Sequence, residues 1–377
     1  MATLETICGQ LLVVGFDGTT LPEALRSRLG RGERGGAVLF KRNIGQSGSA
    51  VDLVQVAKLN AAIAAAAPQD LPPLIGVDQE GGRVQRLGPP VIQLPPMRQL
   101  GDVNDPTLVE RVAKAVGNEL SILGFTMSFA PVLDVDTNPA NPVIGDRSFG
   151  REPRSVMRAG VAYLRGLQSA GVLACAKHFP GHGDTEDDSH LALPRVRHDR
   201  TRLMNTEIPP FRAAIGAGVA AVMTAHVVYD ALDPGVPATL SRAIVGSLLR
   251  AELGFEGVCI SDDLTMRGVS PSGGENPAEV VAVGLEAVAA GCDVLLVAHE
   301  GVAVDALHAA MVERAGKDPK FRARCEQSFE RVVRIRRLSP PRPIVDPARL
   351  SELIPSDLAR QALADLESAL ASGRAAF

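Results

Sequence analysis

Three of the seven histidines lie in one stretch, Ala174 to Pro194, with the sequence ACAKHFPGHGDTEDDSHLALP. The same stretch holds three aspartates, a glutamate and a lysine. Its beginning is apolar, as in a buried strand, and the remainder is a glycine-rich segment carrying ionisable groups. A rigid strand that leads into such a loop is where α/β folds place catalytic groups.

These ionisable groups suit two kinds of chemistry. The first is metal binding, because His and carboxylate side chains suit Zn²⁺ or Fe²⁺; the candidate ligands are His178, His182, Asp184, Asp188 and His190. Barrel metal hydrolases usually draw ligands from several strands, however, and the first predicted strand has no His-x-His pair. The second is a dyad in which Asp188 fixes the tautomer of His190 and the imidazole moves a proton. Lys177 and His178 would then donate to a substrate, and His182 would make a structural hydrogen bond.

A second catalytic group is expected from the segment Val258 to Met266, VCISDDLTM. Asp262 falls where this apolar run ends, so its carboxylate can point into an active site. One carboxylate nucleophile and one proton shuttle are what a retaining glycosidase needs. We expect the neighbouring Asp263 to cap the following turn instead.

Two further segments offer groups for a polar ligand. In IGVDQEGGRVQR, Ile75 to Arg86, the paired glycines permit a tight turn. Asp78 and Arg86 in this segment suit the hydroxyls of a ligand, or form a salt bridge with each other. In IGDRSFG, Arg147 is a permanently charged donor that can reach the same pocket. Asp134 is expected to have a structural role near a strand end.

Eight apolar runs predict the strands that position these groups. They are residues 11–16, 36–40, 74–78, 126–132, 172–176, 221–226, 258–262 and 293–298. Segments with helical spacing alternate with them, including 51–66, 107–123 and 241–253, the last after a Ser241 N-cap. This alternation predicts an α/β fold, a (β/α)₈ barrel, with a doubly wound sheet as the alternative. Polar residues after almost every run favour the barrel, whose strand ends converge on one pocket.

The remainder of the chain predicts a helical extension. Residues 302–337 are helical and contain the eighth barrel helix, and the sequence SPPRP at 339–343 then interrupts the pattern. Residues 356–375 predict an amphipathic helix packed on the barrel or on a second subunit. We therefore expect a catalytic barrel over 1–338 and a proline-rich linker with a helical tail over 339–377.

Composition excludes several classes of protein. The 377 residues carry a net charge of −4 with interspersed signs, which offers no basic face for nucleic acid and no membrane-directed patch. No apolar stretch reaches the roughly 18 residues of a membrane span. The five scattered cysteines suggest a reducing compartment, and the N-terminal segment lacks the basic region of a secretory signal. We expect a cytoplasmic protein.

Taken together, VDQEGGRVQR, IGDRSFG, KHFPGHGDTEDDSH and ISDDLTM resemble the motifs of family 3 glycoside hydrolases, in the same order over roughly residues 11–298. The similarity is greatest to the single-barrel β-N-acetylhexosaminidases of this family. It implies a retaining exo-β-N-acetylglucosaminidase with Asp262 as nucleophile, His190 as acid/base and Asp188 as its partner. It also implies sugar binding by Asp78, Arg86, Arg147, Lys177 and His178, without a metal or cofactor. The usual role of this branch is to remove N-acetylglucosamine from anhydro-muropeptides during cytoplasmic cell-wall recycling.

Several alternatives remain open at this point. They are a β-glycoside phosphorylase, a broad β-glucosidase and hexosaminidase, a metal-dependent hydrolase, and an inactive sugar-binding barrel. The expected partner is a small carbohydrate or a muropeptide, bound by a monomer or a homodimer. The sequence leaves the aglycone undetermined.

Overall fold

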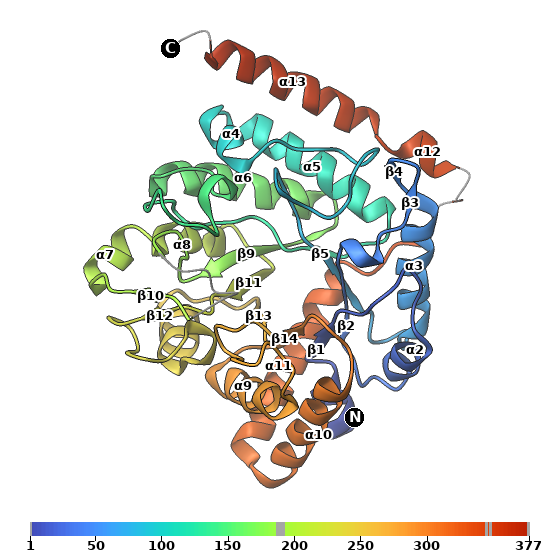
Figure 1. Ribbon diagram of the computed structural model, residues 1–377, viewed down its shortest axis with the longest axis vertical. Helices are drawn as coiled ribbons and strands as arrows, with labels where there is room; N and C mark the ends of the chain where they lie inside the picture. Colours follow the sequence, from blue (N-terminus) through green and yellow to red (C-terminus); the bar gives the residue numbers. More distant parts are fainter. Residues whose placement is uncertain (1, 186–192, 344–345, 347–348, 375–377) are drawn as a thin grey trace.

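Eight parallel strands close into a barrel in the order β1-β14-β13-β11-β9-β8-β5-β2 (Figure 1). The computed structural model describes residues 2–185, 193–343, 346 and 349–374. The barrel strands are β1 (Leu12–Val14), β2 (Gly36–Leu39), β5 (Leu74–Val77), β8 (Met127–Ser128), β9 (Leu173–Phe179), β11 (Ala221–Thr224), β13 (Val258–Asp263) and β14 (Val294–Val297). Each predicted apolar run supplies one strand, so the (β/α)₈ prediction is confirmed and the doubly wound alternative is wrong.

Several strands are shorter or longer than the predicted runs, and the differences in β8 and β9 affect residues near the site. β9 continues to Phe179, so Lys177 and His178 belong to the strand rather than follow it. β8 is only two residues long, although residues 126–132 were expected to form a strand. Pro131 in that run has no N–H to donate to a ladder. The chain nevertheless stays beside β9, because Cys175 N donates to Ala130 O at 2.9 Å and Lys177 N to Pro131 O at 3.1 Å.

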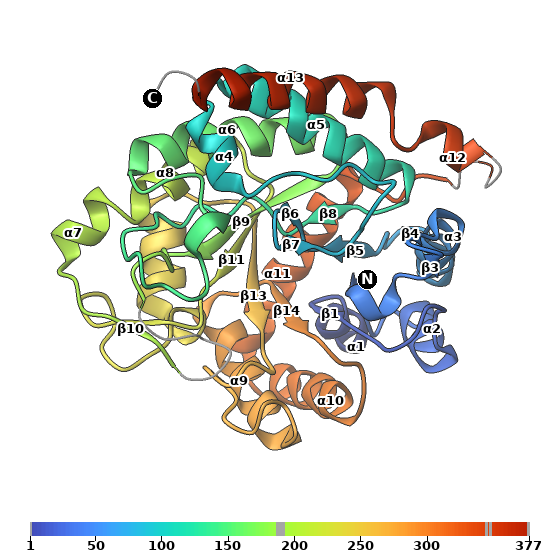
Figure 2. The same cartoon turned by 45° about the horizontal axis from the view of Figure 1, so that its top comes forward.

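Helices surround the barrel on its outer side (Figure 2). They are α2 (Glu23–Gly30), α3 (Leu53–Ala66), α5 (Pro106–Ile122), α6 (Pro153–Ser169), α8 (Ile208–Gly216), the π-helix η4 (Ala243–Glu252), α9 (Pro277–Ala290) and α10 (Val302–Lys317). The helix expected over 241–253 is therefore a π-helix, and the Ser241 hydroxyl accepts from Ile244 N at 3.0 Å, as an N-cap would.

Shorter helices, turns and strand pairs lie before β1 and in the connections between the barrel strands and helices. They are α1 (Leu4–Gly9), α4 (Met97–Asp102), α7 (Arg200–Asn205), the 3₁₀ turns η1 (Lys41–Asn43), η2 (Gly145–Arg147) and η3 (Ala238–Leu240), and the strand pairs β3 (Gln46–Ser47) with β4 (Ala50–Val51), β6 (Gln79–Gly81) with β7 (Val84–Gln85), and β10 (Arg195–Val196) with β12 (Val228–Tyr229). The β6–β7 hairpin follows β5 directly and becomes part of the site.

The helix α11 (Pro319–Leu338) closes the N-terminal end of the barrel. Its Val332 and Ile335 belong to the same buried cluster as side chains from the barrel interior, among them Met127, Phe129 and Ile260. The region expected to be helical over 302–337 is thus two helices, α10 and α11. They are separated at Asp318, whose carboxylate caps α11 by accepting from Lys320 N and Phe321 N.

The C-terminal helix α13 (Asp357–Arg374) lies along α5, after the short α12 (Leu350–Leu353) (Figures 1 and 2). Leu366 on α13 is only 1% exposed, and Arg111 pairs with Asp365 at 2.9 Å. The tail therefore packs on the barrel of its own chain. Within the described ranges, no helix combines the length and apolar character needed to cross a membrane.

Replacing Leu366 by Ala tests this packing. We expect the free energy of unfolding to fall by about 2–4 kcal/mol, because a buried side chain is truncated against α5. Urea unfolding measures the change. The matched control is Leu338→Ala, at a side chain that is 73% exposed, which should change the value by less than about 0.5 kcal/mol. Equal effects of the two changes would contradict the docking of α13.

Candidate active site

A cavity of about 230 Å³ opens at the carboxyl ends of the barrel strands. It is lined by every predicted site residue that the structure describes: Asp78, Arg86, Arg147, Lys177, His178 and Asp262. The predicted Asp188 and His190 lie outside the described residues. In a closed parallel barrel, groups far apart in the sequence meet at this end, which is where barrel enzymes carry their active sites.

Asp262 lies near the end of β13 and lines the cavity. Its Oδ1 accepts a hydrogen bond from Asp263 N at 2.8 Å. Burial by itself would raise the pKa of this carboxyl, but His226, His178, the Asp263 N–H and Lys177 together hold the pKa below its ordinary value. Asp262 is therefore an anion at neutral pH, as a carboxylate nucleophile must be.

Asp263 has the structural role expected of it. Its carboxylate accepts from Thr265 N at 3.1 Å, from the Thr265 hydroxyl at 2.7 Å and from Ala298 N at 3.0 Å, which fixes the turn after β13. Its carbonyl accepts from His226 Nε2 at 2.9 Å. His226 thus supports the backbone beside Asp262.

His226 was not among the predicted site residues, although it ends the predicted run 221–226 as Asp262 ends the run 258–262. The hydroxyl of Thr239 lies 2.8 Å from Nδ1. Since Nε2 donates to a carbonyl, Nδ1 of the neutral ring is the acceptor for Thr239. Burial lowers the pKa of His226, although Asp262 acts in the opposite direction, so the ring is neutral at neutral pH.

Asp134 orients His178, in agreement with its expected structural role. Its Oδ2 lies 2.7 Å from His178 Nδ1, and its Oδ1 accepts from the backbone N–H groups of His178 at 3.1 Å and His182 at 2.7 Å. This carboxylate is fully buried. Its contact with Nδ1 fixes the plane of the His178 ring and places Nε2 on the opposite side.

Three cations and two carboxylates form a compact ionic network in the cavity wall. Lys177 Nζ lies 2.9 Å from Asp78 Oδ1 and 2.7 Å from Glu80 Oε1. Arg147 donates to both oxygens of Glu80, at 2.8 and 2.9 Å, and Arg86 Nη2 lies 3.2 Å from Asp78 Oδ2. Asp78 and Arg86 therefore form the salt bridge and also face the cavity.

The network keeps its members charged although they are buried. Burial opposes the charged form of Asp78, Glu80 and Lys177, but the opposite charges beside each outweigh it. The pKa of both carboxyls is consequently lowered, and the pKa of the Lys177 ammonium is raised. Glu80 was not among the predicted site residues, although it belongs to the motif that supplies Asp78.

The β6–β7 hairpin brings Arg86 back to Asp78. Gly82 occupies the left-handed region with φ of 55°, which favours glycine, and the turn lets Arg86 N donate to the Asp78 carbonyl at 3.2 Å. The paired glycines therefore make the tight turn that the sequence predicts.

The segment after β9 is anchored up to Thr185. The hydroxyl of Thr185 lies 2.9 Å from His182 Nδ1, which is the structural hydrogen bond expected for His182. Burial lowers the pKa of His182 to about 4, so this ring is neutral. Asp184 pairs with His198 and accepts from Thr137 at 2.9 Å. In the part of the chain that the structure describes, no group of three or more His, Cys, Asp or Glu side chains could hold a metal ion.

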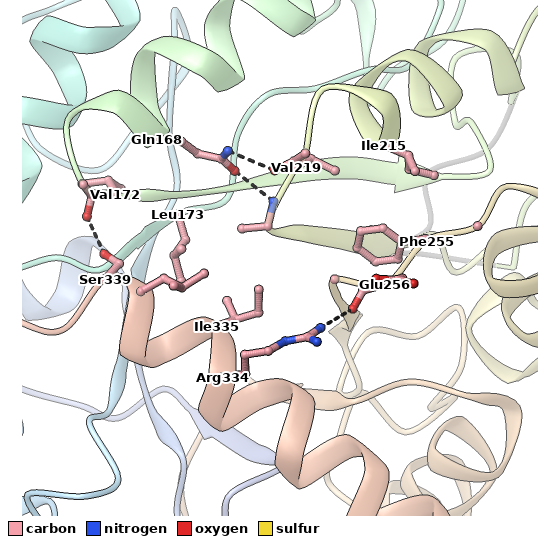
Figure 3. Close-up of a pocket in the computed structure, with 16 residues that line it drawn as sticks. Gln168, Val172, Leu173, Ile215, Val219, Phe255, Glu256, Arg334, Ile335 and Ser339 are labelled. Atoms are coloured by element: carbon pink, nitrogen blue, oxygen red, sulfur yellow. Dashed lines mark hydrogen bonds between the residues drawn. The ribbon is translucent and has the colours of Figure 1, made fainter.

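A larger cavity, of about 540 Å³, lies at the opposite end of the barrel (Figure 3). It lies beside the start of β9 and the end of α11, and its polar groups bond to backbone: Gln168 to Ala220 N, Arg334 to Glu256 O and Ser339 to Gly171 O. None of the predicted site residues lines it. That end of a barrel contributes to stability, so the smaller cavity is the candidate active site.

Known proteins are similar to this chain in both sequence and fold. The model of the glycosyl hydrolase family 3 N-terminal domain matches residues 3–335. A β-hexosaminidase of Neisseria meningitidis serogroup C is 39% identical over 312 residues, which are 81% of this chain and 82% of the relative. One of Stenotrophomonas maltophilia is 42% identical over 305 residues, covering 79% of this chain and 86% of that protein.

Two solved structures extend the comparison. A family 3 β-N-acetylglucosaminidase from a Paenibacillus species superposes with a TM-score of 0.88 at 38% identity, over 98% of this chain and 69% of the other. NagZ from Neisseria gonorrhoeae, in complex with N-trifluoroacetyl-D-glucosamine, gives a TM-score of 0.75 at 31% identity, over 96% of this chain and 97% of the other. This chain therefore belongs to glycoside hydrolase family 3.

Proposed function

We propose that this glycoside hydrolase is a retaining exo-β-N-acetylglucosaminidase. The observation that carries the proposal is the Asp262 carboxylate, kept ionised inside a small cavity lined with cations. The names of the relatives, β-hexosaminidase and β-N-acetylglucosaminidase, support the same activity. The sugar derivative bound to the Neisseria gonorrhoeae protein supports a 2-acetamido sugar as the glycone.

The reaction has two displacements. In the first, an oxygen of Asp262 attacks the anomeric carbon, the glycosidic C–O bond breaks, and the departing oxygen takes a proton from His190. In the second, His190 removes a proton from water, whose oxygen displaces Asp262 from the anomeric carbon. Asp188 accepts from one nitrogen of His190 and leaves the other nitrogen to give a proton in the first step and to take one in the second. Asp188 and His190 are assigned by the motif, because they lie outside the described residues.

The cavity wall supplies groups of both signs for the sugar hydroxyls. Asp78 accepts hydrogen bonds, whereas Arg86, Arg147 and Lys177 donate them, and His178 presents Nε2 because its Nδ1 lies against the Asp134 carboxylate. The cavity has a volume of about 230 Å³, which suits one terminal sugar and exo-action. We further propose anhydro-muropeptides as the natural substrates and the cytoplasm as the place of action, as the motif resemblance implies.

Replacing Asp262 by Asn tests the nucleophile. Turnover of an aryl β-N-acetylglucosaminide should fall by at least about 10⁴-fold, since the group that forms the covalent bond is removed. Intact-mass analysis with a 5-fluoro glycoside should show one adduct on the wild type, mapped to Asp262 by peptide sequencing. An adduct on another residue, with turnover retained in Asp262→Asn, would refute the assignment.

The pH profile tests the acid/base. His190 must be protonated to assist departure, so kcat/KM should fall as pH rises through the pKa of this imidazole, near 6.5 for an ordinary His. Asp262 must be ionised, and because its pKa is lowered, activity should be lost on the acid side only below the ordinary range of an aspartate carboxyl. In His190→Ala, a substrate whose leaving group needs no proton should react without the alkaline decline. Persistence of that decline would exclude His190 as the acid.

A panel of aryl β-glycosides tests the glycone. The 2-acetamido-glucoside should exceed the glucoside in kcat/KM by at least about 100-fold, because a site built for a polar substituent rejects the analogue that lacks it. Both substrates are measured with the same leaving group, so that only the 2-substituent differs. Comparable values would instead indicate a broad β-glucosidase and hexosaminidase.

A further inference from the structure

We infer that Glu80 is a positioning residue for sugar binding, because its buried carboxylate fixes Arg147 against Lys177 in the cavity wall. The inference rests on the proposed function, in which Arg147 and Lys177 donate to the sugar. The Glu80 side chain accepts from Arg147 Nε at 2.9 Å, from Arg147 Nη2 at 2.8 Å and lies 2.7 Å from Lys177 Nζ. A carboxylate with three such contacts is held in one orientation.

Glu80 itself is held firmly by the barrel. Its side chain is 1% exposed, and it belongs to β6, which follows β5 without a long connection. Its carbonyl accepts from the hydroxyl of the buried Tyr163 at 3.1 Å, which links β6 to α6. The carboxylate therefore has a rigid support.

Arg147 is the group that depends most on this support. It lies in the turn η2, within the long connection between β8 and α6, whereas Lys177 lies on β9. Arg147 also donates to the Val143 carbonyl at 3.1 Å, but that bond stays within the same connection. Lys177 has a second carboxylate in Asp78, at 2.9 Å. Glu80 thus links Arg147 to the barrel, and Lys177 keeps an anchor without it.

Charge leads to the same conclusion. The network holds three cations, Arg86, Arg147 and Lys177, against the two carboxylates Asp78 and Glu80. Neutralising Glu80 would leave the Arg147 guanidinium beside the Lys177 ammonium with no carboxylate between them. Repulsion between two partly desolvated like charges would then displace Arg147 from the position in which it meets the sugar.

The test is Glu80→Gln, which keeps the shape and removes the charge. We expect kcat/KM for an aryl β-N-acetylglucosaminide, per folded enzyme, to fall about 100-fold, as a displacement of the order of 1 Å at a binding group does. In an Arg147→Met background the same change should cost less than about 3-fold, because the group that Glu80 positions is gone. The double variant Glu80→Gln with Arg147→Met lacks the guanidinium that Glu80→Gln alone leaves unpaired. Its kcat/KM can therefore be measured even if the single variant Glu80→Gln folds poorly.

The matched control is Glu119→Gln. Glu119 is equally buried and accepts from Ile92 N at 2.7 Å and Ser356 N at 2.9 Å, on the outer side of the barrel. Its loss should lower the melting temperature and leave kcat/KM per folded enzyme within about 3-fold of the wild type. If Glu80→Gln behaves like this control, or still costs about 100-fold in Arg147→Met, the positioning role is overturned. If Arg147→Met alone turns over normally, the assignment of Arg147 to sugar binding is wrong. This result is distinct from one in which Arg147 matters but Glu80 does not position it.

Discussion

The site depends on the pairing of charges that are removed from water. Asp78 and Glu80 lie at the carboxyl end of the barrel with Lys177 and Arg147 between and beside them, all largely buried. A charge in such a place is tolerated when it has an opposite partner and hydrogen bonds. This requirement positions the hydrogen-bond donors of the cavity, Lys177 and Arg147, before a substrate binds. A second buried carboxylate, Asp134, does the same for His178 through its ring and backbone N–H groups.

The barrel makes this pairing possible by bringing distant segments to one end. Glu80 and Arg147 are 67 residues apart, and Asp78 and Lys177 are 99 apart. At the opposite end, apolar side chains of the strands pack against Val332 and Ile335 of α11, beside the larger cavity. One end of the same eight strands thus provides stability, and the other carries the charged groups.

Much of the fold was accessible from the sequence because buried parallel strands leave continuous apolar runs, such as Val258–Ile260. The site residues were accessible because each follows such a run or lies in a recognisable motif. His226 carried the same signal at the end of its run but was not chosen, whereas Glu80 was missed for a different reason. Nothing local distinguishes Glu80 from an exposed glutamate, since its partners lie on other strands and connections. The extension of β9 likewise depends on hydrogen bonds to residues far away in the sequence, such as Lys177 N to Pro131 O. Asp188 and His190 remain predictions of the motif.

We propose that Asp262 forms a covalent bond to the sugar inside the cavity walled by Asp78, Arg147 and Lys177. A crystal structure of the enzyme trapped with a fluorinated N-acetylglucosaminide tests it most directly. We expect continuous electron density from Asp262 to the anomeric carbon, with sugar hydroxyls in contact with Arg147 and Lys177 and with Glu80 still paired to both cations. A sugar bonded to another residue, or seated away from this cavity, would contradict it.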